Sequence, residues 1–100
     1  MSFSETELLV IRWGEARGIV QCSTPAAQAK KTIEELDELL AAIKAGDRAA
    51  MADAYGDILV TLVMGCACAD MNLLTCFEGA YNEIKNRKGS LNKESLWVKE

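Results

Sequence analysis

The chain has 100 residues, of which half are hydrophobic, one is proline and none is histidine, and its net charge is −4. This composition is typical of a small globular domain with one core, and it excludes a disordered chain. The absence of histidine excludes imidazole catalysis and histidine-containing zinc sites, and the negative charge argues against a general nucleic-acid binder. Acid–base chemistry must therefore come from carboxylates, lysine, tyrosine or cysteine.

The start of the chain lacks the pattern of a secretory signal, which combines a basic start, an apolar stretch and a small-residue cleavage site. The most apolar uninterrupted run extends only from Ile58 to Ala69. A membrane span needs about 20 residues, so we expect a buried helix here. These features predict a soluble, cytoplasmic protein that binds neither membrane nor nucleic acid.

Capping and stop signals predict two helices in the first half of the chain. Ser4 and Glu7 have the spacing of a capping box, and Gly18 ends the helix that they begin. The second helix begins at the Ser-Thr pair before Pro25, because proline suits a first turn, and it ends at Gly46. The two predicted helices lie near residues 4–17 and 24–45.

Two further helices are predicted in the second half of the chain. Asp47 is a good N-cap for a helix near residues 48–69, and another helix follows near residues 73–88, before an irregular C-terminal tail. Short connections make consecutive helices antiparallel neighbours, so we expect one all-α domain over residues 1–100, built like an antiparallel four-helix bundle. The third helix is apolar on nearly all sides in its second half, which predicts a central position or a subunit interface.

Four carboxylates fall within five residues of the second predicted helix. Glu34, Glu35 and Glu38 share an arc of about 100° on the helical wheel, whereas Asp37 lies outside it. Like charges this close destabilise a helix, and a divalent cation would reverse that effect because Mg²⁺ prefers oxygen ligands. A solvated face, on which Lys31 offsets part of the repulsion, is the alternative interpretation of this stretch.

A second acidic pair lies across the predicted turn. Asp53 and Asp57 are four residues apart and share one face of the third helix, with the helix-weakening Gly56 between them suggesting close approach of a backbone or ligand. Glu38 lies nine residues before Asp47, and Asp57 lies ten residues after it. At about 1.5 Å per residue, the two carboxylates reach nearly the same height in an antiparallel hairpin. The two acidic clusters can therefore meet across one groove, which favours a metal site.

The end of the fourth predicted helix is basic, with Lys85, Arg87 and Lys88 in the stretch YNEIKNRKG. Cations suit the C-terminal end of any helix, and that interpretation needs no ligand. Beside a groove of metal and carboxylates, the same cations and Asn82 would suit a polyphosphate.

Four ordered blocks carry a resemblance to a known family: STPAAQAKKTIEE, its overlapping EELDE, DAYGDILV, and YNEIKNRKG followed by WVKE. Together, from Trp13 to Glu100, they resemble the MazG-like nucleoside triphosphate pyrophosphohydrolases, an all-α family, and in particular its small phage-type members. EELDE matches the family motif EExxE. In many members the second motif is ExxD. Here the residue three before Asp57 is Ala54, and the acidic residue, Asp53, lies four before Asp57. Both spacings share a helix face, so Asp53 can take that place.

The resemblance implies Mg²⁺-dependent hydrolysis of (deoxy)nucleoside triphosphates between the α and β phosphates, yielding a monophosphate and pyrophosphate, with Mn²⁺ able to substitute. It also implies nucleotide-pool housecleaning by a cytoplasmic homodimer or homotetramer. The metal ligands implied are Glu35, Glu38, Asp53 and Asp57. Glu34 is implied as the catalytic residue that orients or deprotonates the attacking water.

The resemblance further implies a set of substrate-binding residues: Trp13, Gln28, Lys31, Tyr81, Asn82, Lys85 and Arg87. The cations would contact phosphates, Asn82 a phosphate or the sugar, and Trp13 the base. A tryptophan on an amphipathic helix also suits a core position, and Tyr81 is ambiguous in the same way. Two other functions are compatible with the sequence: a non-catalytic helical interaction module, and a regulator that binds metal and nucleotide without cleavage.

Overall fold

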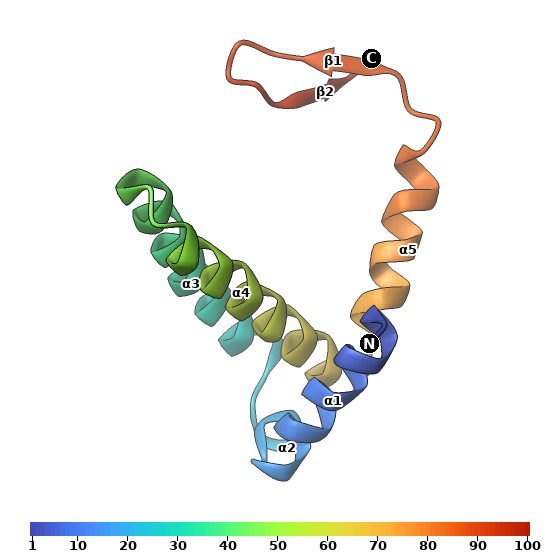
Figure 1. Ribbon diagram of the computed structural model, residues 1–100. Coiled ribbons are helices and arrows are strands. Elements are labelled where there is room, and N and C mark those ends of the chain that lie inside the picture. The colour runs from blue at the N-terminus through green and yellow to red at the C-terminus, as the bar shows by residue number, and fades with distance from the viewer.

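The computed structural model describes residues 1–100 and contains five helices and one two-stranded hairpin (Figure 1). The all-α class and the four predicted helices are confirmed, and one short helix is additional. The elements are α1 (Phe3–Ala16), α2 (Ile19–Cys22), α3 (Pro25–Ala45), α4 (Arg48–Cys68), α5 (Leu73–Ile84), β1 (Gly89–Leu91) and β2 (Trp97–Lys99).

Helices α3 and α4 form an antiparallel hairpin and lie side by side along their length (Figure 1). The hydroxyl of Thr24 accepts a hydrogen bond from the Ala27 N–H at 3.0 Å and begins α3. Gly46 ends α3 with φ of 67°, a conformation that glycine adopts without strain. Asp47 begins α4 by accepting from the Ala50 N–H at 3.0 Å. The predicted start and stop signals of these two helices are therefore confirmed.

The buried apolar core lies along the interface of α3 and α4, and α1 packs against α4. Its apolar members are Leu39, Ala42, Ala54, Val63 and Met64. The hydroxyls of Thr32 and Thr61 are 2.7 Å apart and join α3 to α4. Gly14 brings α1 close to α4, because a β-carbon at this position would lie 2.8 Å from Met64 Cε.

Helix α1 begins with a capping box of Ser2 and Glu5, not two residues later as predicted. The same spacing occurs twice in the sequence, and the earlier pair starts the helix. Glu7 has another partner: it is buried and accepts hydrogen bonds from Asn72 Nδ2 at 2.8 Å and from the Leu74 N–H at 3.0 Å. Glu7 thereby ties α1 to the first turn of α5.

Helix α5 ends at Ile84 rather than near residue 88, and the tail forms a hairpin instead of being irregular. The strands are antiparallel, with Leu91 opposite Trp97. Asn92 Oδ1 accepts from two backbone N–H groups of the connecting loop, and Ser95 takes a positive φ of 64° there. This local turn chemistry makes the hairpin, although no glycine marks its loop.

Helix α5 and the hairpin, residues 73–99, form an arm that extends away from α3 and α4 (Figure 1). The radius of gyration is 15.6 Å, against about 13 Å for a compact chain of this length. Only 9 of the 100 residues are buried, so large apolar side chains remain uncovered on the helices and on the arm. They include Ile33, Leu40, Leu59, Phe77, Ile84 and Trp97.

Helix α4 is also long and apolar enough to cross a membrane, with a mean hydropathy of 1.4 over its most apolar 18 residues. The apolar run from Ile58 to Ala69, on which the sequence expectation depends, covers only the second half of this helix. Length and composition are weak evidence, because the core helix of a soluble protein can meet the same criteria. Here α4 packs along α3 and carries Asp53 and Asp57, and carboxylates are costly inside a bilayer.

Candidate metal centre

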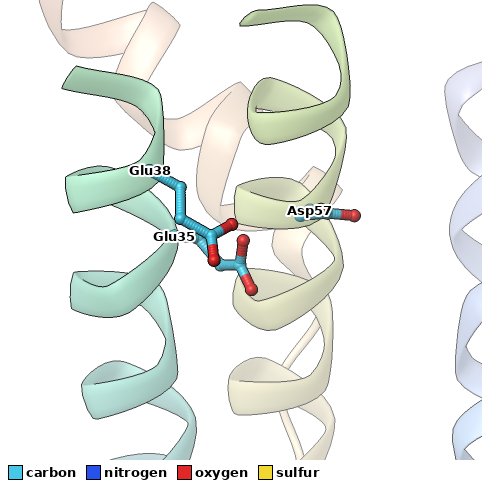
Figure 2. A group of neighbouring side chains, drawn as sticks. All are labelled: Glu35, Glu38 and Asp57. Carbon is cyan, nitrogen blue, oxygen red and sulfur yellow. The ribbon is translucent and has the colours of Figure 1, made fainter. Parts of the chain in front are cut away.

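Three carboxylates of α3 and α4 lie close together. Glu35, Glu38 and Asp57 each offer one oxygen, and these oxygens lie within 4.8 Å of one another. Figure 2 shows Glu35 and Glu38 extending from α3 toward α4, where Asp57 lies at a similar height. The structure thus brings together three of the four predicted metal ligands, and the acidic clusters meet as the height argument predicted.

The register of the α3–α4 hairpin places these carboxylates. The turn at Gly46 sets the pairing of the helices, and the bond between Thr32 and Thr61 fixes it nearer the site. Thr32 lies three residues before Glu35, and Thr61 lies four residues after Asp57. Both threonines therefore stand about one helical turn from a carboxylate, and they hold the two acidic faces opposite each other.

Glu35 is the buried member of the three-carboxylate group. It is only 8% exposed, and its Oε2 is buried without a hydrogen-bond partner. The pKa of Glu35 is raised by a hydrogen bond with Glu38, by burial and by the negative charges of Glu38 and Asp57, while Lys31 opposes the shift. A buried, unsatisfied carboxylate is unfavourable unless a cation or donor compensates it. The donor set is all oxygen, so these residues fit a hard divalent cation.

Lys31 stands at the rim of the carboxylate group. Its Nζ lies 3.0 Å from Glu34 Oε2 and 3.8 Å from Glu35 Oε1. The hydrogen bond to Glu34 and the charges of Glu34 and Glu35 raise the pKa of Lys31. The Glu34 side chain is 66% exposed and lies outside the three-carboxylate group. Glu34 is therefore close enough to act at the edge of the site, and its catalytic role stays a prediction.

A pocket of about 540 Å³ adjoins the metal centre. Three predicted substrate-binding residues, Trp13, Gln28 and Lys31, line it together with Glu35 and Asp57. Helix α2, which was not predicted from the sequence, contributes Ile19 to the same wall. The pocket thus combines carboxylates, a cation, an amide and an indole.

The side chain of Gln28 is held in this pocket by Ser23, for which the sequence predicted no role at the site. Gln28 Nε2 lies 2.9 Å from the hydroxyl of Ser23, just before α3. No motif in the sequence signals this pair, because it depends on how α2 leads into α3.

The fourth predicted metal ligand, Asp53, lies outside the three-carboxylate group. Asp53 lines a neighbouring pocket of about 670 Å³ between α1 and α4, together with Asp57 and Gly56. A β-carbon at Gly56 would meet no atom within 4 Å, so the predicted close approach of a backbone does not occur within this chain. Asp53 therefore stands one turn from the metal centre.

The four predicted substrate-binding residues of the C-terminal region lie on the arm, away from the carboxylates (Figure 1). They are Tyr81, Asn82, Lys85 and Arg87. Lys85 Nζ donates to Asn82 Oδ1 at 3.4 Å, within the arm itself. The expectation that these residues flank the metal within one chain is not met, because Glu7 ties the start of α5 to α1 and the helix runs outward.

The all-α fold and the three neighbouring carboxylates define, as a class, a helical protein with an acidic cluster that could hold a metal ion. Residues 23–91 match the family described as the MazG nucleotide pyrophosphohydrolase domain. The match covers more than half of the sequence, so the chain belongs to the MazG family, whose members are metal-dependent nucleotide pyrophosphohydrolases. The resemblance seen in the sequence is therefore confirmed. Neither the curated proteins nor the solved structures contain a significant match.

Proposed function

We propose that this chain is a Mg²⁺-dependent pyrophosphohydrolase that cleaves (deoxy)nucleoside triphosphates at the α–β bond, to nucleoside monophosphate and pyrophosphate. The observation that carries the proposal is the buried Glu35 carboxylate, whose unsatisfied Oε2 lies within the three-carboxylate group. The family supplies the general reaction. Mg²⁺ suits an all-oxygen site that leaves coordination positions for phosphate oxygens, and Mn²⁺ would substitute.

In this proposal Glu35, Glu38 and Asp57 hold the cation, and Asp53 assists from one turn away. When bound, a divalent cation there neutralises phosphate charge and lowers the pKa of a water molecule. Glu35 would hold the cation as an ionised carboxylate, so its raised pKa makes metal binding compete with protonation. Glu35 Oε2, which lacks a hydrogen-bond partner, would then be available to hold the cation.

We propose that Glu34 orients the attacking water and accepts its proton. Its exposed carboxylate at the rim can reach a water that approaches from solvent. Lys31 lies between Glu34 and Glu35, where it can also stabilise charge on the phosphates. A substrate phosphate would compete with Glu34 for Lys31, which would free the carboxylate for proton transfer.

The rest of the substrate would occupy the pocket beside the carboxylates. Gln28 offers polar contacts, and Trp13 offers an aromatic face to the base. We propose that removal of unwanted nucleotides, that is, nucleotide-pool housecleaning, is the biological role. Relative turnover across a panel of triphosphates gives the base preference of the pocket.

We further propose a cytoplasmic homodimer or homotetramer in which the arm of a second copy reaches the site. Two features support it: apolar side chains are uncovered on both the arm and the helices, and the arm lies far from its own carboxylates. A second copy would cover such surfaces, as is common in symmetric oligomers. Its arm would bring Tyr81, Asn82, Lys85 and Arg87 to the phosphates.

A panel of ribo- and deoxynucleoside triphosphates tests the proposal. Each is incubated with the full chain and Mg²⁺, Mn²⁺ or a chelator, and the products are separated by ion exchange. We expect monophosphate and pyrophosphate with either metal and no turnover with the chelator. Absence of turnover with every nucleotide would favour a non-catalytic module that binds metal or nucleotide.

A further inference from the structure

The pocket beside the metal centre has two unlike walls. Helix α3 supplies Gln28, Lys31 and Glu35, whereas α1 and α2 supply Trp13 and Ile19. A ligand that fills this space needs a polar, anionic part near Lys31 and a flat or apolar part near the indole. A nucleotide has this division, with phosphates at one end and a base at the other.

Trp13 is placed at the edge of this pocket by the packing of its neighbour. Gly14 is buried against Met64, where a β-carbon would lie 2.8 Å from Met64 Cε, so α1 runs close to α4 at this point. The Trp13 residue itself remains 43% exposed. It also lines a smaller hollow between α1 and α4, of about 410 Å³. The indole therefore lines the boundary of the pocket and is not a core residue.

Arg17 makes two contacts with Trp13. Its guanidinium carbon lies 4.7 Å from the centre of the Trp13 ring, and its Nη1 donates to the Trp13 backbone oxygen at 3.3 Å. A planar guanidinium stacks well on an indole face. An aromatic ring has two faces, and Arg17 covers one of them.

We infer that Arg17 is a positioning residue that holds the Trp13 indole as the stacking wall for the nucleobase. The inference rests on the proposed function, because it takes a nucleoside triphosphate as the ligand. Arg17 acts through Trp13 and does not contact phosphate. It restricts the rotation of the indole before the base arrives, and it places a positive charge behind the ring.

Arg17 has a structural role that the test must separate from this one. It follows the last turn of α1, and its backbone N–H bonds the Gly14 and Glu15 carbonyls. A cation suits the C-terminal end of a helix. Loss of that role lowers the stability of the fold, whereas loss of the stacking wall weakens the binding of bases and spares the binding of bare phosphates.

The experiment compares Arg17→Ala and Arg17→Lys in the full chain with Arg12→Ala, which removes an equal charge from within α1. The Trp97→Phe background leaves Trp13 as the only tryptophan, because the chain has two. The probes are an α,β-methylene deoxynucleoside triphosphate, followed by Trp13 fluorescence and by calorimetry, and inorganic tripolyphosphate, followed by calorimetry. Turnover of a deoxynucleoside triphosphate by the chain with Trp97 intact gives KM and kcat independently of that background.

We expect Arg17→Ala to lower the affinity for the nucleotide analogue by about two- to five-fold. It should also reduce the quenching of Trp13 fluorescence by the bound analogue. Tripolyphosphate affinity should be unchanged, KM should rise with kcat constant, and Arg17→Lys should recover part of the loss. Arg12→Ala should match the parent chain. An equal loss of affinity for the analogue and for tripolyphosphate, or no loss of affinity for either, would overturn the inference, whatever the stability of the variant.

The same measurements separate this inference from the proposed function. If the analogue binds and quenches Trp13 in an Arg17-dependent way but no triphosphate is cleaved, the pyrophosphohydrolase proposal fails and the stacking wall stands. If triphosphates are cleaved but KM does not respond to Arg17→Ala, the stacking wall fails and the proposed function stands.

Discussion

Glu35 and Asp57 lie on helices joined by the turn at Gly46, and their carboxylate oxygens lie within 4.8 Å of each other. Two carboxylates at this separation repel each other, and here one of them is also buried. The fold therefore holds negative charge together, and Lys31 offsets it only from the edge of the group. A bound metal should stabilise the protein, because the folded chain presents a formed site that the unfolded chain lacks.

Replacing Glu38 by Gln should remove the metal response without unfolding the protein. We expect activity to fall by at least about a hundred-fold, beyond the loss caused by an outer-shell partner. The metal-free melting temperature should stay the same or rise slightly, because one of several clustered charges is gone. Thermal unfolding with Mg²⁺ and with a chelator measures this.

Asp37→Asn is the matched control for that experiment. It makes the same charge change on the same helix, outside the three-carboxylate group. It should keep the Mg²⁺-dependent rise in melting temperature and most of the activity. A Glu38→Gln chain that still responds to Mg²⁺ as strongly as the control would contradict the metal assignment.

The metal-free protein should lose stability as the pH rises from the acidic range. Glu35 has a pKa above the ordinary glutamate value of 4.5, through its bond with Glu38 and through burial. An acid whose pKa is raised on folding stabilises the folded state below its unfolded pKa, and this contribution is lost as the pH rises through the folded value. The contribution of Glu35 to the melting temperature, with a chelator present, should therefore decline with pH between these two values.

Glu35→Gln isolates that effect, because other carboxylates also titrate in this range. Across the same pH window, the melting temperature of the parent should decline relative to that of the variant. With Mg²⁺ the parent should instead gain stability with pH, since the cation binds the ionised carboxylate. A difference that does not vary with pH would contradict the raised pKa of Glu35.

Gly14→Ala should destabilise the protein relative to the control below, because the new β-carbon would lie 2.8 Å from Met64 Cε and would displace this buried side chain. Overpacking of this kind costs about 1–3 kcal/mol, and each 1 kcal/mol lowers the melting temperature of a small domain by about 4–8 °C. Gly79→Ala is the control, since a β-carbon there meets nothing within 4 Å. Alanine should stabilise α5 by up to about 1 kcal/mol. Equal effects of the two changes would contradict the packing of α1 on α4.

Mixing two inactive variants tests whether the arm acts on another copy. One carries Glu38→Gln, and the other carries Lys85→Ala and Arg87→Ala. If the cations come from a second copy, subunit exchange should restore about a quarter of the parent activity in a randomly mixed symmetric dimer. No recovery, although light scattering shows mixed oligomers, would contradict this arrangement.

The α3–α4 hairpin and its carboxylate group could be predicted from the sequence because their signals are local. Gly46 and Asp47 mark the turn, and counting outward from it aligned Glu38 with Asp57. The same count places Thr32 opposite Thr61, because the two lie at nearly equal separations before and after Asp47. That bond was predictable in the same way, although the residue types gave no reason to look for it.

The direction of the arm could not be predicted from local signals. It depends on Glu7, whose carboxylate accepts bonds from Asn72 and Leu74, in a distant part of the chain. The spacing of Glu7 from Ser4 predicted a capping box, and the earlier pair took that role. Bundle geometry assumed that α5 returns along α3 and α4, and this placed Lys85 and Arg87 beside the metal centre.

Phosphorus-31 NMR of a deoxynucleoside triphosphate turning over in the presence of Mg²⁺ tests the central claim most directly, because it identifies which phosphate bond is broken. The parent chain should convert the α, β and γ resonances into those of the monophosphate and pyrophosphate. Glu38→Gln should leave the triphosphate intact, and Asp37→Asn should behave as the parent. Formation of the diphosphate and orthophosphate, or equal turnover by the Glu38→Gln chain, would contradict α–β cleavage at this metal centre.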